Sequence, residues 1–153
     1  MNRRETLSLL ACALIVLLTL CTASSADEPS SKSHRVAIQV DTNDPATINL
    51  VLNNARNVVE YYTARKEEIA IEIVAYGPGL HMLRADTSTV KDRLQSLHES
   101  MPQINFSACE NTKHGMEKAE GKEIMLVPEA RLVPSGVVRL MELEEQGWSY
   151  VRP

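Results

Sequence analysis

Five short runs of apolar residues recur along the chain and are separated by longer segments of mixed polarity. Three of them are almost continuously apolar and rich in β-branched residues, as is typical of strands covered on both faces of a sheet. These runs lie at 36–40, 69–76 and 104–108. Two shorter runs, at 130–133 and 148–151, have a similar character. The pattern therefore predicts five strands.

Between these runs, apolar residues recur at spacings of three and four, which indicates amphipathic helices. The clearest spacing extends from Ile48 to Tyr62 and follows Asp44 and Pro45, a suitable N-cap residue and a proline at the first helical position. Ser88 or Thr89 is expected to cap the next long helix. The other helical segments are predicted at 80–83, 88–101, 111–121 and 137–146.

Strands that alternate with helical segments favour right-handed βαβ crossovers and a parallel sheet with helices on both faces. We therefore expect an α/β protein, a three-layer α/β/α sandwich around a mainly parallel five-stranded sheet. One domain over 35–153 accounts for all five strands, and a chain of this length leaves no room for a second domain.

The first residues have the pattern of a secretory signal peptide. Arg3 and Arg4 precede an apolar run from Leu9 to Leu20, and small residues follow up to Ala26. The run is shorter than the roughly 20 residues that cross a bilayer, so cleavage is favoured over a retained anchor. We expect a signal peptide at 1–26, a disordered polar leader at 27–34, a periplasmic or secreted protein, and no stable membrane insertion after cleavage.

Charge and motifs exclude several classes of function. Loss of the signal would shift the formal net charge from −4 to about −5, and such a balance argues against a nucleic-acid partner. The four histidines do not pair with each other or with a cysteine at metal-ligand spacings. The chain has no P-loop, dinucleotide fingerprint or nucleophile elbow. We expect neither a metal nor an organic cofactor.

Cysteine usage is the most informative count. Cys12 and Cys21 leave with the signal peptide, and Cys109 remains alone at the end of the third predicted strand. No internal disulfide is then possible. A lone thiol in an oxidising compartment is either buried and inert or present for its reactivity.

Ligands of open parallel sheets bind outside the carboxyl ends of the strands, which directs attention to the loops there. A helix that starts at Asn111 or Thr112 would favour the thiolate form of Cys109, whereas Glu110 would oppose it. His114, one helical turn after Glu110, is a candidate general base, with a solvated helix residue as the alternative.

Glycines mark two of these loops. Gly77 and Gly79 could let backbone N–H groups approach an anion or a persulfide sulfur, although a tight turn explains them equally well. Ser135 and Gly136 follow the fourth predicted strand and lie at the same edge of the sheet.

Four segments together resemble the DsrE/DsrF-like family, in particular its small secreted bacterial members. They are RVAIQVDTNDPATINLVLNNARN, IEIVAYGPGLHML, INFSACENT and VPSGVVRLMELEEQGWSYVRP. The resemblance implies an α/β/α sandwich with a parallel five-stranded sheet, assembly as a homotrimer or homohexamer, and sulfur transfer through a cysteine persulfide. The family's sulfur-carrying cysteine follows the third strand, and Cys109 occupies the matching place.

Two readings of the function follow. In the first, Cys109 accepts sulfane sulfur from a donor and passes it to an acceptor protein or a small thiol, with Gly77, Gly79, Asn111 and Thr112 around the sulfur. In the second, the chain is a homo-oligomeric ligand-binding or scaffold protein without catalytic activity, and Cys109 is a packed small hydrophobe. A disulfide-cycling oxidoreductase would need a resolving cysteine from another subunit.

Overall fold

The computed structural model describes residues 33–153. The predicted signal peptide at 1–26 and residues 27–32 of the predicted leader lie outside the described residues. Ser33 and His34, which the sequence assigned to the leader, belong instead to strand β1 (Ser33–Val40). Their backbones pair with Glu68 and Ile69 of the neighbouring strand. A strand can extend past its apolar core in this way because ladder hydrogen bonds need no apolar side chain.

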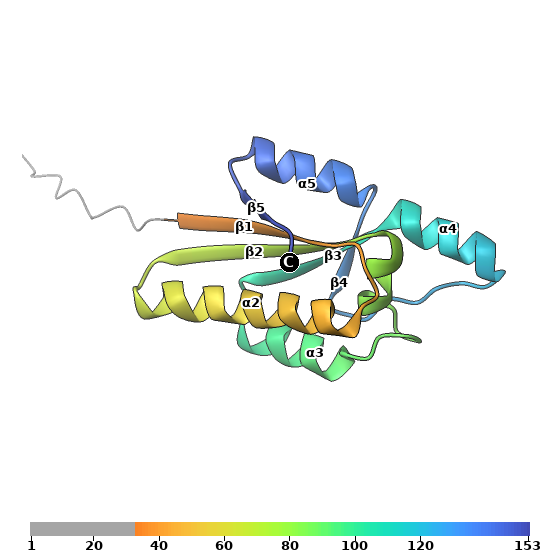
Figure 1. The fold of residues 1–153 in the computed structure, drawn as a ribbon, viewed down its shortest axis with the longest axis horizontal. Coiled ribbons are helices and arrows are strands. Elements are labelled where there is room, and N and C mark those ends of the chain that lie inside the picture. The colour runs from red at the N-terminus through yellow and green to blue at the C-terminus, as the bar shows by residue number, and fades with distance from the viewer. Residues whose placement is uncertain (1–32) are drawn as a thin grey trace, which may run out of the picture. The chain divides into compact units, whose positions relative to one another are not determined.

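Five strands form one sheet in the order β4-β3-β2-β1-β5, and every neighbouring pair is parallel (Figure 1). The strands after β1 are β2 (Glu68–Ala75), β3 (Ile104–Cys109), β4 (Ala130–Val133) and β5 (Ser149–Val151). Each connection between them contains at least one helix. The predicted α/β fold with helices on both faces of a parallel five-stranded sheet is confirmed.

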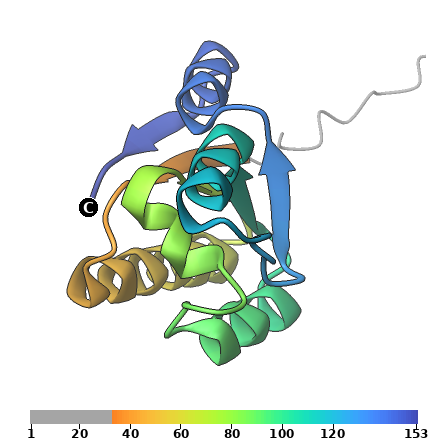
Figure 2. The same cartoon turned by 90° about the vertical axis from the view of Figure 1, so that its right-hand side faces the viewer.

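Helices cover the two faces unequally (Figure 1). Helices α2 (Pro45–Ala64) and α3 (Lys91–Ser100) pack on one face, and α5 (Gly136–Glu145) packs on the other. Figure 2 looks onto the remaining end of the sheet, where the 3₁₀ helix η1 (Gly77–Leu83) and helix α4 (Glu110–Glu120) lie in front of the strands. These two elements stand at the carboxyl ends of β2 and β3.

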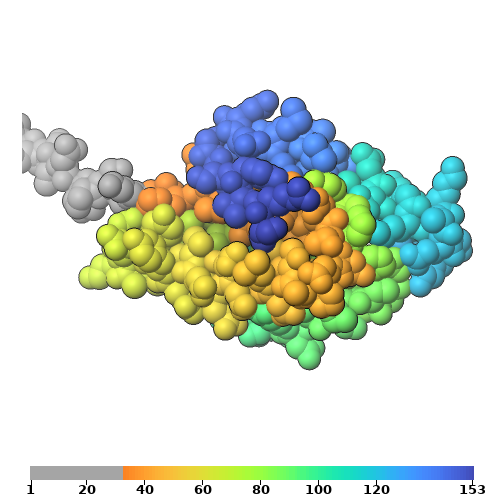
Figure 3. Space-filling model, viewed as in Figure 1, coloured from red at the N-terminus to blue at the C-terminus, as the bar shows by residue number. Residues whose placement is uncertain are grey.

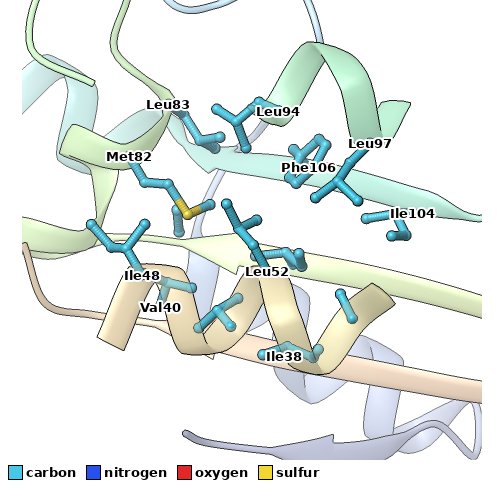
Figure 4. Packing of buried hydrophobic residues seen from close by; sticks show 14 of the residues in the cluster. Ile38, Val40, Ile48, Leu52, Met82, Leu83, Leu94, Leu97, Ile104 and Phe106 are labelled. Atoms are coloured by element: carbon cyan, nitrogen blue, oxygen red, sulfur yellow. The ribbon is translucent and has the colours of Figure 1, made fainter. Parts of the chain in front are cut away.

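The main hydrophobic core lies between the sheet and the pair α2 and α3, as Figure 4 shows. Leu52 from α2 and Leu94 from α3 are fully buried against Phe106 of β3. The apolar spacing of α2 places one face of this helix inward, and its buried residues are the predicted ones: Ile48, Val51, Leu52, Ala55 and Val59.

A smaller core lies under α5, where Leu140 and Leu143 pack on Ala37 and Val74 of the sheet. Trp148 is partly buried beside them. In Figure 3, the blue atoms of α5 and β5 lie over the orange atoms of β1. A single helix therefore closes this face of the sheet.

Helix capping agrees with the sequence at α2 and differs at α3. Asp44 caps α2, with its carboxylate 2.8 Å from the backbone nitrogen of Thr47. Helix α3 begins after Val90, which has no side-chain cap, and not after Ser88 or Thr89. The Ser88 hydroxyl instead accepts a hydrogen bond of 3.3 Å from the backbone N–H of Val90, a local turn that competes with the helix.

Candidate functional site

Cys109 stands where β3 changes directly into α4. It is the last residue of the strand and the N-cap of the helix, with φ −68° and ψ 115°. Its Sγ accepts a hydrogen bond of 3.4 Å from the backbone N–H of Thr112. A serine or aspartate commonly fills this position, and here a thiol does so. The sulfur therefore sits at the positive end of the helix dipole. The helix starts at Glu110, slightly earlier than the sequence predicted.

Several hydrogen-bond donors converge on this sulfur. Burial by itself raises the pKa of the Cys109 thiol. The Thr112 hydroxyl and the backbone N–H groups of Gly136, Thr112 and Asn111 lower it by more, so the pKa lies below its ordinary value. The N–H of Asn111 is shared with the carbonyl oxygen of Pro134, 3.3 Å away. Donors of this kind favour the thiolate, the nucleophilic form of cysteine.

The Thr112 hydroxyl has a second partner in the loop after β2. The backbone N–H of Gly77 donates to Thr112 Oγ1 at 3.0 Å. Gly77 has a positive φ of 50°, which glycine adopts without strain. Because the hydroxyl oxygen accepts from Gly77, its own hydrogen is available to the Cys109 sulfur. Gly77 therefore acts on the thiol through Thr112.

Gly79 has a packing role. A Cβ at this position would lie 2.1 Å from the carbonyl oxygen of Val40, so only glycine lets η1 approach the end of β1. Its N–H donates to the carbonyl oxygen of Tyr76 at 3.0 Å. The N–H groups of Gly77 and Gly79 thus both donate to other groups of the protein. The loop after β2 acts on the thiol only through the side chain of Thr112.

A second glycine contact fixes the connection between β4 and α5. A Cβ on Gly136 would lie 2.9 Å from Cβ of Tyr76. The close approach of these two residues fixes the Gly136 backbone, whose N–H lowers the pKa of the Cys109 thiol. Ser135, the preceding residue, caps α5 through its hydroxyl, 3.5 Å from the backbone nitrogen of Val138.

The buried side chain of Arg84 holds the other end of α4 to η1. Its guanidinium bonds both carboxylate oxygens of Asp86, at 2.9 and 2.8 Å, and Glu120 at 2.5 Å. Hydrogen bonds from Arg84 hold the pKa of Asp86 and of Glu120 below their ordinary values. Helix α4 is therefore attached to η1 near both ends, which fixes the orientation of its first turn at Cys109.

His114 does not join the cluster around the thiol. It is exposed on α4. Within residues 33–153, the groups that lower the pKa of Cys109 belong to Thr112, Gly136 and Asn111. The structure thus brings Asn111 and Thr112 to the sulfur and leaves His114 on the solvent side.

Access to the sulfur is narrow. Cys109 is 5% exposed, and its neighbour in the sheet, Val133 of β4, is also buried. Hydrogen-bond donors of Thr112, Asn111 and Gly136 lower the pKa of this thiol. The thiol is therefore buried, in surroundings that stabilise its negative form.

Sequence reasoning missed a buried charge network on the same face of the sheet. Glu72 of β2 is 1% exposed and accepts hydrogen bonds from Ser107 at 2.7 Å and twice from Arg139 at 2.8 Å. Arg131 of β4 also forms an ion pair with this carboxylate. Burial raises the pKa of Glu72, but these hydrogen bonds outweigh it and lower the pKa. One acid inside an apolar strand was the signal available in the sequence.

Residues 33–153 contain no group of three or more His, Cys, Asp or Glu side chains that could hold a metal ion. Nor does this part of the chain contain a helix with the length and apolar content that a membrane span requires.

Comparison with known proteins shows a likeness to a solved structure. No family model matches the sequence, and no curated protein matches it. The chain is similar to a solved structure from Methanobacterium thermoautotrophicum, MTH1491, a protein of unknown function. The two share 30% sequence identity and a TM-score of 0.64, over 78% of this chain and 99% of the archaeal one. The chain therefore belongs to the same protein family as MTH1491.

Proposed function

We propose that this chain is an exported sulfur carrier of the DsrE-like type, which holds sulfane sulfur as a persulfide on Cys109. The observation that carries the proposal is the place of one unpaired thiol as the N-cap of α4, where the N–H of Thr112 donates to its sulfur at 3.4 Å and donors of Asn111 and Gly136 also lower its pKa. A packed structural cysteine needs no such donors, whereas a nucleophilic thiolate does.

The chemistry requires two partners. The thiolate of Cys109 attacks a sulfane sulfur, a new S–S bond forms, and the electron pair of the broken bond leaves with the rest of the donor. An acceptor protein or a small thiol then attacks the outer sulfur of the persulfide, and the Cys109 thiolate leaves. The same N–H groups stabilise the thiolate before the first step and after the second.

Assembly as a homotrimer or homohexamer and a periplasmic or secreted location belong to the same proposal. Exposed apolar side chains near the site support self-association, since patches of this kind commonly mark interfaces. They lie on α5 and the adjacent edge strand β4: Leu132, Val137, Val138 and Met141.

The narrow access to Cys109 favours one competing function, a homo-oligomeric ligand-binding or scaffold protein without catalytic activity. In that case the thiol is only a small buried side chain. The two functions differ in the response of the folded protein to an alkylating reagent such as iodoacetamide. A sulfur carrier is labelled at Cys109 under native conditions, and a scaffold is labelled there only after denaturation.

Mass spectrometry tests the carrier directly. The protein is incubated with thiosulfate or polysulfide, and its mass is compared with that of Cys109→Ser treated in the same way. We expect a gain of one or more sulfur atoms that a reductant removes, in the wild type only. An unchanged wild-type mass with every donor contradicts the proposal, and an equal gain in Cys109→Ser shows that sulfur attaches elsewhere.

A further inference from the structure

The proposed function requires a donor molecule to reach a sulfur that the folded protein covers. Cys109 is 5% exposed, and the first turn of α4 lies against its sulfur, where the N–H of Thr112 donates at 3.4 Å. Strand β3 is fixed in place, because it is paired with a strand on each side. Access to the thiol therefore depends on how firmly α4 is held.

Apolar packing contributes little to holding α4. None of its 11 residues is buried, and Met116 is only partly buried against the main core. Helix α5, by comparison, buries Leu140 and Leu143. Figure 1 shows α4 extending past the carboxyl ends of the strands, where it covers neither face of the sheet. Elements with few buried apolar contacts open at a lower free energy than the core of a protein.

Charged groups take the place of apolar packing at the far end of this helix. The guanidinium of Arg84 is 1% exposed and bonds both oxygens of Glu120, the last residue of α4, at 2.5 and 2.9 Å. Arg84 also bonds Asp86, and Lys122 contacts the two acids at 2.9 and 3.5 Å. We call these four side chains the latch. Bonds between charged groups are stronger than neutral hydrogen bonds, so the latch is the strongest attachment of α4.

The latch can release α4 without leaving a buried charge unpaired. Of its four members, Glu120 is the one that lies on α4. When Glu120 leaves, Arg84 keeps its two bonds to Asp86, at 2.9 and 2.8 Å, and Lys122 keeps its bond to the same acid. Removal of every partner from a buried guanidinium would be far more costly. The latch therefore has two arrangements, one with Glu120 and one without it.

The chain provides two places about which α4 can turn. One is its junction with β3 at Cys109, and the other is its C-cap, Gly121, which has a φ of 66° and where a Cβ would meet nothing within 4 Å. Hinges are commonly a few residues at the ends of an element. The chain is fixed again at Ile124, which is 1% exposed. Its N–H donates to Glu117 of α4 at 3.0 Å, one further polar bond that a turn of the helix would break.

We propose that α4 is a lid over the Cys109 thiol and that the latch holds this lid shut. The inference rests on the proposed function and states how donor and acceptor reach its site. In the closed state the first turn of α4 covers the sulfur. Opening separates Glu120 from Arg84, lets α4 turn about its two ends and exposes the sulfur to a donor or to an acceptor thiol. Closing then shields the sulfur between the two steps.

The rate at which iodoacetamide alkylates Cys109 in the native protein measures lid opening. Glu120→Gln removes one charge of the latch and leaves Arg84 paired with Asp86, so the variant should fold. We expect labelling faster by about tenfold or more, a change of about 1.4 kcal/mol in the opening equilibrium. Glu123→Gln is the matched control, since Glu123 is an exposed acid just after α4 and joins no ion pair found within residues 33–153. Equal rates in the two variants overturn the proposal.

Hydrogen exchange followed by NMR separates lid opening from unfolding of the whole protein. The informative amides bond across the edges of α4, from Gly77 to Thr112 and from Ile124 to Glu117. They should exchange faster in Glu120→Gln by a factor similar to that of the alkylation. The amides of β3 should keep their wild-type rates, because this strand does not move with the lid. Equal acceleration in β3 would show that the variant opens by unfolding, and this contradicts a lid.

Sulfur loading distinguishes failure of the lid from failure of the carrier function. Polysulfide should load Cys109 in the wild type, and faster in Glu120→Gln. Loading of the wild type, with alkylation and exchange that do not respond to Glu120→Gln, overturns the lid and leaves the carrier function intact. Faster alkylation and exchange in Glu120→Gln, without a gain in mass from any sulfur donor, support the lid and remove the carrier function instead.

Discussion

The backbone N–H of Gly77 donates a hydrogen bond of 3.0 Å to the hydroxyl oxygen of Thr112. This contact joins the loop after β2 to the first turn of the helix after β3. The same side chain lowers the pKa of the Cys109 thiol. Two neighbouring loops of a parallel sheet thus act on one thiol, as expected for a site at the carboxyl ends of the strands.

Replacing Thr112 by valine should raise the pKa of the Cys109 thiol. Valine keeps the shape of threonine but cannot donate to the sulfur, and the backbone donors remain. The pH profile of iodoacetamide alkylation in the native protein measures the change, which should appear as slower labelling near neutral pH. Thr112→Ser retains a hydroxyl and should leave the profile close to that of the wild type. Identical profiles for valine and serine contradict the role of the hydroxyl.

Gly136→Ala should lower the stability of the protein and raise the pKa of the Cys109 thiol. The new Cβ would lie 2.9 Å from Cβ of Tyr76, so the backbone must move and carry its N–H away from the sulfur. We expect a loss of about 1–3 kcal/mol in the free energy of unfolding, as for other overpacked sites, together with a higher thiol pKa. Urea denaturation and the alkylation profile measure the two effects.

Gly115→Ala is the control for this substitution. Gly115 lies inside α4, and a Cβ there would meet nothing within 4 Å. Alanine should therefore stabilise the protein by about 0.5–1 kcal/mol, because glycine is costly inside a helix. A similar loss of stability in both variants would show that close contact with Tyr76 is not the cause.

His114→Gln should leave the alkylation profile of Cys109 unchanged. The imidazole is exposed on α4, and the donors around the sulfur come from other residues. A general base within reach of the thiol would instead make labelling depend on the histidine. Slower labelling in the glutamine variant, at unchanged melting temperature, would give His114 the role that its place in the sequence suggested.

The ion pairs of Glu72 should make stability depend on pH in the acid range. The pKa of this carboxyl is lower in the folded protein than its ordinary value of 4.5, so its charge stabilises the folded state above that pH. As the pH falls through the lower, folded value, the carboxylate is protonated and this stability is lost.

Glu72→Gln tests this dependence. At neutral pH we expect a loss of about 3 kcal/mol, because the substitution leaves Arg139 partly buried beside a neutral amide. The difference from the wild type in urea denaturation should shrink as the pH is lowered below 4.5. A constant difference across the acid range would mean that the charge of Glu72 contributes nothing.

Leu52 and Leu50 of α2 test the inward face of the helix. Leu52 is fully buried, whereas Leu50 is 46% exposed. Leu52→Ala should lower the free energy of unfolding by about 2–5 kcal/mol through lost burial and the cavity left behind. Leu50→Ala should change it by about 0.5 kcal/mol or less. Thermal or urea denaturation of the pair compares them, and equal losses would contradict the orientation of α2.

The order and type of the elements could be predicted from sequence because each depends on local spacing. The apolar run from Ile69 and the spacing that includes Leu52 are specified by neighbours along the chain. Boundaries were less accurate. Ser33 belongs to a strand because its backbone pairs with Glu68, and α3 begins only after Val90. The periodicity of apolar residues encodes neither of these boundaries.

The sequence by itself determined the strand and helix pattern, the unpaired Cys109 and its place at a strand end. Only the tertiary structure decided what surrounds that sulfur, because the groups that lower its pKa come from the first turn of α4 and from Gly136, and Gly77, from a third segment, acts on it through Thr112. The same holds for Glu72, whose partners Ser107, Arg131 and Arg139 come from two other strands and a helix. Backbone N–H groups carry no residue identity, so a sequence cannot show which of them will point at a thiol.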